Sequence, residues 1–235
     1  MNKRKIYSYS WVAVICFLLA GCNSFLDHDP DDRLQINSLD RIAQTVTGAY
    51  NTYSLRFTDM SSDNVGLVDG IYYTEIAMED LYTWSRDIRD QEHQDSPGAY
   101  WVNAYNAIAN VNVALESLDQ LEIKEEDKSR AAVIRGEALL LRSYYHFCLV
   151  NLFAPHYNEA MAAKTPGVPY MKEVEDELIV HYERNSVEEV YRLAEEDLQE
   201  AIRLIEANKG NFNNNKYHFT LPTMYLYASL SLIHI

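Results

Sequence analysis

The chain has 235 residues, which is enough for one domain or at most two, and 48% of them are hydrophobic, which is enough for a sizeable core. It is strongly acidic, with 35 Asp and Glu residues against 20 Lys and Arg residues and a formal charge of −15. Because such a charge repels phosphate backbones, we expect no nucleic-acid partner.

Residues 1–21 have the three parts of a bacterial lipoprotein leader. A positive segment, Lys3-Arg4-Lys5, precedes an apolar run from Trp11 to Ala20, which is too short to span the roughly 30 Å of bilayer hydrocarbon comfortably. The lipobox Leu19-Ala20-Gly21-Cys22 follows, with small residues that fit a narrow peptidase pocket and a thiol that receives diacylglycerol. We therefore predict cleavage after residue 21 and a lipid anchor on Cys22. The alternative is an ordinary signal peptide followed by a chance cysteine.

Residues 22–37 form an acidic segment that we predict to be a solvated tether. Aspartates crowd around Pro30, and their Asp-x-Asp-x-Asp spacing resembles a calcium-binding loop. However, Arg33 stands where that loop needs glycine, and Ser38 stands where it needs a bidentate glutamate. The tether is therefore the favoured interpretation. Beyond residue 37 we expect a body without a membrane-spanning segment.

The body, residues 38–235, shows helical periodicity and no convincing strand pattern. Ser38 and Ser186 are good N-caps, and Ser186-Val-Glu-Glu189 is a capping box. Helix pairs of this size stack in tetratricopeptide-like arrays, so the predicted fold is all-α, with helix pairs joined by long irregular loops. The helices are expected from Ser38 to near Arg56, from Pro97 past Leu118, from about Glu126 to Phe153, from Ser186 past Ile205 and near Pro222.

Residues 57–97 and 154–185 are predicted to be long irregular segments. The first is interrupted by Gly66, Gly70 and many Asp and Ser residues. Long segments of this kind in compact domains are usually functional or disordered. The aromatic residues of the first segment favour an ordered structure.

Aromatic side chains in residues 72–101 are the best candidates for a binding site. Sugars present C–H patches that pack on aromatic faces, while their hydroxyls need fixed donors and acceptors. The alternative is that these rings pack the loop onto the helices, and we favour that alternative for Tyr100 and Trp101 because they lie on a helical stripe. The candidate ligand-binding residues are Tyr72, Tyr73, Tyr82 and Trp84.

No pattern in the sequence predicts catalysis, a cofactor or a metal site. The glycines form neither a nucleophile elbow nor a phosphate-binding loop, and the histidines lack metal-ligand spacing. Carboxylates are abundant, but nothing indicates which two would meet as a glycosidase pair. Cys148 lies in an apolar helical stretch and is predicted to be a small buried hydrophobe.

Several segments together carry a resemblance to one known family. They are Cys22-Asn-Ser-Phe-Leu-Asp27, the stretch from Tyr100-Trp-Val-Asn to Asn110, Arg135-Gly-Glu-Ala-Leu-Leu-Leu-Arg142, Val168-Pro169, Arg184-Asn-Ser-Val-Glu-Glu-Val-Tyr191 and Asp197-Leu198 with Ala201-Ile202. In this order and spacing, behind a lipobox, they resemble the N-terminal half of the SusD/RagB family. The resemblance covers nearly the whole chain after the leader.

The resemblance implies both a fold and a function. Members of that family are outer-membrane lipoproteins of Bacteroidetes-type bacteria, exposed at the cell surface and built on tetratricopeptide-like helix pairs. They cap a TonB-dependent transporter of the SusC type and capture a nutrient, usually a glycan and sometimes a peptide, without acting as enzymes. A lipid-anchored helical scaffold that binds only protein, or a hydrolase, is the alternative. Family members are usually about twice as long, so we expect residues 38–235 to be an incomplete N-terminal domain.

Overall fold

The computed structural model describes residues 36–50, 55–66, 68, 75–175, 180–212 and 218–234, without the side chains of 232–234. The chain divides into two units, residues 1–36 and 37–235. The predicted leader, Cys22 and nearly all of the predicted tether lie outside the described residues.

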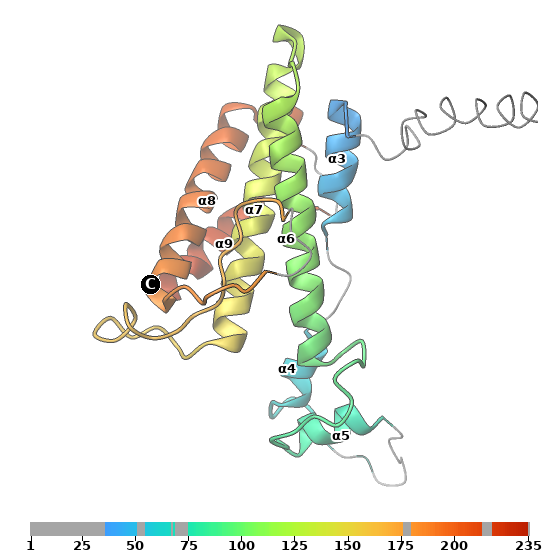
Figure 1. Cartoon of the computed structure of the whole chain (residues 1–235), viewed down its shortest axis with the longest axis vertical. Coiled ribbons are helices and arrows are strands. Elements are labelled where there is room, and N and C mark those ends of the chain that lie inside the picture. The colour runs from blue at the N-terminus through green and yellow to red at the C-terminus, as the bar shows by residue number, and fades with distance from the viewer. Residues whose placement is uncertain are drawn as a thin grey trace, which may run out of the picture. The chain divides into compact units, whose positions relative to one another are not determined.

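The described part of this unit is all-α, as the sequence predicts (Figure 1). Its residues form no β-strand, and a single isolated bridge joins Pro166 to Ser186. None of the described helices is both long and apolar enough to cross a membrane. The helices are α3 (Leu39–Gly48), α4 (Arg56–Met60), α5 (Ile76–Tyr82), α6 (Pro97–Gln120), α7 (Lys128–Phe153), α8 (Val187–Ala207) and α9 (Leu221–His234), with the 3₁₀ turns η2 (Glu125–Asp127) and η3 (Lys209–Asn211).

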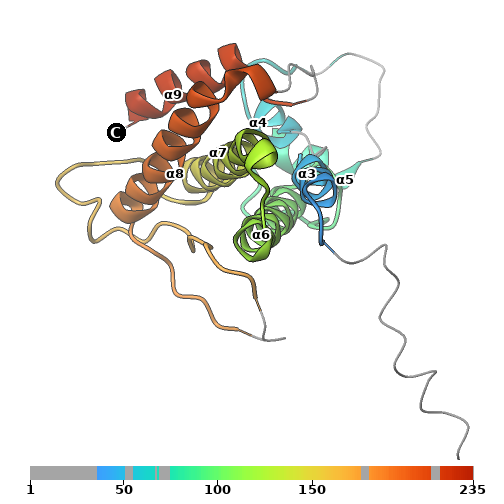
Figure 2. The same ribbon diagram turned by 90° about the horizontal axis from the view of Figure 1, so that it is seen from above.

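Helix α7 is the centre of the core. It lies between α6 and α8 and packs most extensively on α8 (Figure 2). Residues on nearly all of its faces are buried, which is typical of a helix surrounded by others. Gly136 permits the close approach of α8, because a Cβ atom there would lie 2.8 Å from Ile205 Cγ1 and 3.2 Å from the Ala201 carbonyl oxygen.

The predicted N-caps Ser38 and Ser186 are confirmed at the starts of α3 and α8, and both α6 and α8 bury an apolar stripe. On α6, Ile108 and Leu118 are buried, whereas Ala109 is exposed. Helix α8 buries its stripe from Val187 to Ile205, with Ile202 half-buried. The side chain of the N-cap Ser186 accepts a hydrogen bond from the Glu189 backbone N–H at 3.2 Å.

The first helix is shorter than the sequence indicates. We expected it to reach Arg56, but α3 ends at Gly48. The Ala49 N–H bonds to the carbonyls three and four residues earlier, which tightens the last turn. Tyr50 then donates its hydroxyl to Glu137 on α7 at 2.6 Å. The apolar spacing was misleading here because Ala49 and Tyr50 pack against the core from outside the helix.

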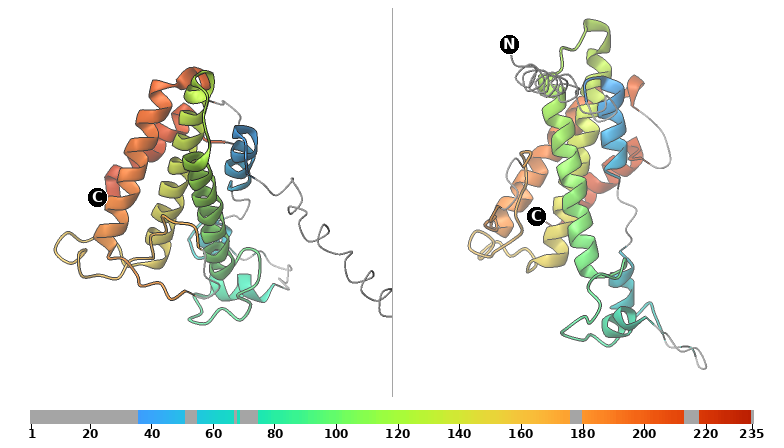
Figure 3. Two further views of the ribbon diagram at one scale, coloured as in Figure 1. Left: turned by 45° about the horizontal axis from the view of Figure 1, so that its top comes forward. Right: turned by 45° about the vertical axis from the view of Figure 1, so that its right-hand side comes forward.

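The region predicted as irregular from 57 to 97 contains two short helices, α4 and α5. We call its described residues, 55–66, 68 and 75–96, the α4–α5 lobe. It lies at the N-terminal end of α6 in Figure 1 and in both views of Figure 3. Arg56 forms an ion pair with Asp95 at 3.0 Å, and the rings of Phe57 and Tyr100 lie 5.8 Å apart. The ion pair joins two parts of the lobe, and the ring contact attaches the lobe to the start of α6.

Residues 166–174, here called the strap, lie against α6 and α7. Because they form no strand, side chains of the helices satisfy their backbone polar groups instead. The strap is therefore fixed through its main chain. The bonds are Tyr105 hydroxyl to Pro169 O (2.9 Å), Met171 N–H to His146 Nε2 (3.0 Å), Asn112 Nδ2 to Met171 O and Glu173 O (both 3.2 Å) and Arg142 Nη1 to Lys172 O (3.3 Å).

Arg142 and Asp197 form a buried ion pair beneath the strap. Arg142 donates to the Asp197 carboxylate through Nε at 2.6 Å and Nη2 at 2.8 Å. The Tyr170 hydroxyl donates to the same carboxylate at 2.7 Å, and its ring stacks on His146 with centroids 3.7 Å apart. Burial lowers the pKa of His146 to about 3. The imidazole is therefore neutral, with Nε2 accepting from the strap and Nδ1 donating to the Arg142 carbonyl.

Candidate ligand-binding site

The structure separates the aromatic candidates into two groups. Tyr82 is half-buried at the end of α5, and Trp84, two residues later, is 77% exposed. Tyr72 and Tyr73 lie outside the described residues. Tyr100 is buried, and the Trp101 ring packs edge-on against Phe153 on α7 at 5.0 Å. The packing interpretation of Tyr100 and Trp101 fits these contacts, and Trp84 is the most exposed of the described candidates.

Trp84 occupies an unusual backbone position. Its φ angle is 54°, in the left-handed region where glycine is normally found. Its N–H bonds to the Leu81 carbonyl, and the Ser85 N–H bonds to the Asp80 carbonyl at 2.8 Å. These two bonds define a Schellman motif, so Trp84 fills the site after α5 that favours glycine. The left-handed conformation costs on the order of 1 kcal/mol for a side chain with a Cβ atom.

The turn after Trp84 closes back on α5 through an ion pair. Asp80, only 3% exposed, accepts from the Arg89 backbone N–H at 2.8 Å and from its Nε and Nη2 atoms at 2.9 and 2.6 Å. The Arg89 side chain and its N–H lower the pKa of the Asp80 carboxyl. Arg89 also reaches Glu79 at 3.2 Å. No sequence pattern indicated this pair, because Arg89 lies beyond the end of α5 and only the fold of the turn brings it to Asp80.

This geometry suits the binding of a sugar ring. An exposed indole offers a broad apolar face at a small entropic cost, and it can pack on the C–H patch of a pyranose. The Glu79 side chain is more than half exposed, and its carboxylate can accept hydrogen bonds from hydroxyls. The lobe can therefore combine stacking with hydrogen bonding.

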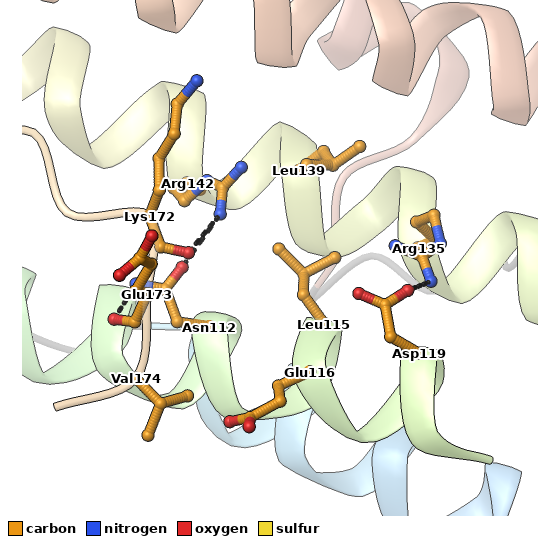
Figure 4. A pocket seen from close by; sticks show the side chains of 10 residues that line it. All are labelled: Asn112, Leu115, Glu116, Asp119, Arg135, Leu139, Arg142, Lys172, Glu173 and Val174. Atoms are coloured by element: carbon orange, nitrogen blue, oxygen red, sulfur yellow. Dashed lines mark hydrogen bonds and ion pairs between the residues drawn. The ribbon is translucent and has the colours of Figure 1, made fainter. Parts of the chain in front are cut away.

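A second candidate, a cavity of about 470 Å³, lies between α6, α7 and the strap (Figure 4). Its lining contains no aromatic side chain, and both of its arginines are already paired with carboxylates. Arg135 bonds to Asp119, and Arg142 is held by Asn112 at 3.0 Å. This cavity lacks a stacking surface for a sugar, so the α4–α5 lobe is the stronger candidate.

A third, more apolar groove of about 390 Å³ runs along α9. The rings that line it pack on one another, with Tyr144 5.5 Å from both Phe219 and Tyr227. On its rim, Leu226 is 69% exposed and Leu230 is 44% exposed. This aliphatic rim is less suited to a sugar than the exposed indole of Trp84.

The motif from Arg135 to Arg142 has a structural explanation at each of its polar positions. Arg135 pairs with α6 and Arg142 with α8, as described above. Glu137 accepts from the Tyr50 hydroxyl and from His218 Nδ1 at 2.7 Å, which links α7 to the residues before α9. These residues hold the bundle together and belong to the core rather than to a ligand site. Cys148 on the same helix is half-buried, and burial raises the pKa of its thiol.

Comparison with known proteins adds independent information. The family model described as "Starch-binding associating with outer membrane", of the SusD-like type, matches residues 24–234. A search of curated proteins finds no match.

Solved structures share the fold. A SusD superfamily protein from Bacteroides thetaiotaomicron superposes with a TM-score of 0.63 at 18% identity, over 84% of this chain and 42% of its own. A SusD-like carbohydrate-binding protein from Bacteroides vulgatus gives 0.64 at 17% identity, with the same coverage. A laminarin-binding SusD-like protein gives 0.55 at 23% identity, over 83% of this chain and 41% of its own.

The chain thus spans less than half the length of these structures. At these identities the structural likeness shows the fold alone, whereas the family model covers almost the entire chain. The resemblance seen in the sequence is confirmed: the chain belongs to the SusD-like family.

Proposed function

We propose that this protein captures a glycan at the bacterial cell surface and delivers it to a TonB-dependent transporter of the SusC type. A lipid on Cys22 would anchor it to the outer membrane, and no bond in the glycan would be made or broken. A peptide ligand is the alternative cargo. The family description names starch and the outer membrane, and two of the solved structures are named as carbohydrate- and laminarin-binding.

The observation that carries this proposal is the exposure of Trp84 in a strained backbone position. Its indole is 77% exposed, and its backbone is held in a conformation that glycine would adopt at lower cost. Neither burial nor local geometry favours tryptophan at this position. A role in contacting a ligand explains why a large aromatic side chain is present there.

The proposal is tested by isothermal titration calorimetry of the full chain against soluble starch, laminarin and a mixture of casein peptides. We expect heat with at least one of the two glycans. Trp84→Ala should weaken that binding about tenfold, because loss of a stacked ring removes about 1.5 kcal/mol. If only the peptides bind, the cargo is a peptide and not a glycan. If none of the three ligands gives heat, the proposal is contradicted.

Two further variants separate binding from folding. Trp84→Gly should weaken glycan binding as much as Trp84→Ala while keeping or raising the melting temperature, because glycine relieves the left-handed strain. Trp101→Phe should leave affinity unchanged, because Trp101 packs against Phe153. Equal affinity in wild type and Trp84→Gly would remove Trp84 from the site.

The membrane anchor has its own test. Mass spectrometry of the protein isolated from its native host should find acyl chains on Cys22 and no residues before it. An unmodified N-terminal cysteine would contradict the anchor and would leave the glycan-binding proposal unaffected.

A further inference from the structure

The α4–α5 lobe contains a small closed loop, and Asp80 holds both of its ends. The loop runs from Ser85 to Arg89 and directly follows Trp84. The Asp80 carbonyl accepts from Ser85 N–H at 2.8 Å, and the Asp80 carboxylate accepts from Arg89 N–H, also at 2.8 Å. One residue of α5 therefore fixes the first and last residues of the loop.

The Arg89 side chain strengthens the closure. Its Nε and Nη2 atoms donate to the two Asp80 oxygens as a fork, a geometry that fixes direction as well as distance. Within the loop, Ser85 Oγ donates to the Asp87 carbonyl at 3.0 Å. The Asp80 side chain is 5% exposed, so solvent competes little for this carboxylate.

Trp84 has no comparable packing of its own. Its side chain is largely exposed, and its backbone lies in a conformation that is intrinsically unfavourable for it. Without the closed loop, the chain after Tyr82 could relax to a conformation that redirects the indole. The Schellman bond from Ser85 and the Arg89 fork both act against that relaxation.

We infer that Asp80 and Arg89 are positioning residues, which hold the Trp84 indole in its binding orientation before the glycan arrives. This inference rests on the proposed function, because it concerns the same stacking side chain. An indole that is already ordered loses less conformational entropy on binding, so removal of the ion pair should weaken glycan binding about three- to tenfold. Neither Asp80 nor Arg89 needs to touch the ligand for this effect.

The test follows Trp84 alone by fluorescence. The chain has three tryptophans, so Trp11→Phe combined with Trp101→Phe leaves Trp84 as the sole emitter. In that background, Asp80→Asn and the milder Arg89→Lys should accelerate the anisotropy decay of Trp84 and weaken binding of soluble starch or laminarin. Glu200→Gln is the matched control, because Glu200 and Arg203 form an exposed two-bond pair on α8. It should change neither quantity.

The outcomes distinguish the inference from the function on which it rests. An unchanged anisotropy decay in both Asp80→Asn and Arg89→Lys would overturn the positioning role, whatever happens to affinity. A faster decay with unchanged glycan affinity would overturn it as well. If Trp84→Ala itself leaves affinity unchanged, the stacking role of Trp84 fails, while the anisotropy measurement still reports whether the pair orders the indole.

Discussion

His146 is a fully buried histidine that acts as a neutral hydrogen-bonding group between α7 and the strap. It is 0% exposed, and burial lowers its pKa from 6.5 to about 3 in the folded protein, with a further contribution from the Arg142 charge. Protonation therefore favours the unfolded chain at any pH below about 6.5. The stability that His146 contributes is complete above that pH and is lost progressively as the pH falls towards 3.

His146→Gln should make the stability of the protein less sensitive to acid. A glutamine oxygen can accept the Met171 N–H in place of Nε2 and does not titrate, so the decline of the free energy of unfolding between about pH 6.5 and 4.5 should be shallower than in wild type. Urea unfolding at a series of pH values measures this slope. His156→Gln is the control, since His156 is exposed. Identical slopes for wild type and His146→Gln would contradict the assignment.

Trp84 and His146 also show what a sequence can reveal about single residues. The aromatic content of residues 72–101 was sufficient to nominate Tyr82 and Trp84 as candidates. It could not separate an exposed ring from a packed one, because exposure depends on which neighbours the fold brings close. The pairing of Asp80 with Arg89, and of His146 with the strap backbone, depends on the same tertiary arrangement.

At the scale of helices, length decided what could be predicted. Helices α6, α7 and α8 have 24, 26 and 21 residues, so their apolar positions recur over many turns, and α6 and α8 also begin at serine caps. Helices α4 and α5 have five and seven residues, which is too short for a period to emerge. Contacts such as Phe57 with Tyr100 stabilise them, and those contacts are invisible in the sequence.

Close packing of α7 on α8 makes a prediction about Gly136. Gly136→Ala should lower the free energy of unfolding by about 1–3 kcal/mol, because the added Cβ would meet Ile205 Cγ1 and the helices must move apart. Helix propensity alone would predict that alanine raises the free energy of unfolding.

Gly48→Ala provides the matched control for this substitution. No atom lies within 4 Å of a Cβ built on Gly48, at the last residue of α3, so alanine there should stabilise the protein by up to about 1 kcal/mol. Urea unfolding of both variants gives the comparison. Stabilisation by both alanines would show that α7 and α8 are not in tight contact at Gly136.

For the molecule as a whole, the rim of the groove along α9 is the main exposed apolar feature described on the bundle. Leu226 and Leu230 lie one helical turn apart beside the rings of Tyr144 and Phe219. Apolar surface of this kind promotes association, because water is released when it is covered. We expect the isolated chain to self-associate through this face as its concentration rises.

Sedimentation velocity over a concentration series tests that expectation. Leu226→Glu should shift the chain towards monomer, because a charge in the groove opposes its burial. Val102→Glu, at a residue of α6 that is 56% exposed, introduces the same charge elsewhere and should leave association unchanged. Equal association of wild type and Leu226→Glu would exclude this face as the contact.

The strap has a consequence for engineering. The helices hold it by its main-chain atoms and by the buried Tyr170 side chain, while Glu173 is held through its carbonyl oxygen and is itself exposed. A new side chain, a fluorophore or a short peptide tag could therefore be grafted at Glu173 without loosening the segment, whereas Lys172 also pairs with Glu196 at 3.8 Å. Sequence variation at such an exposed position should be tolerated for the same reason, because the main-chain hydrogen bonds that hold the strap remain intact.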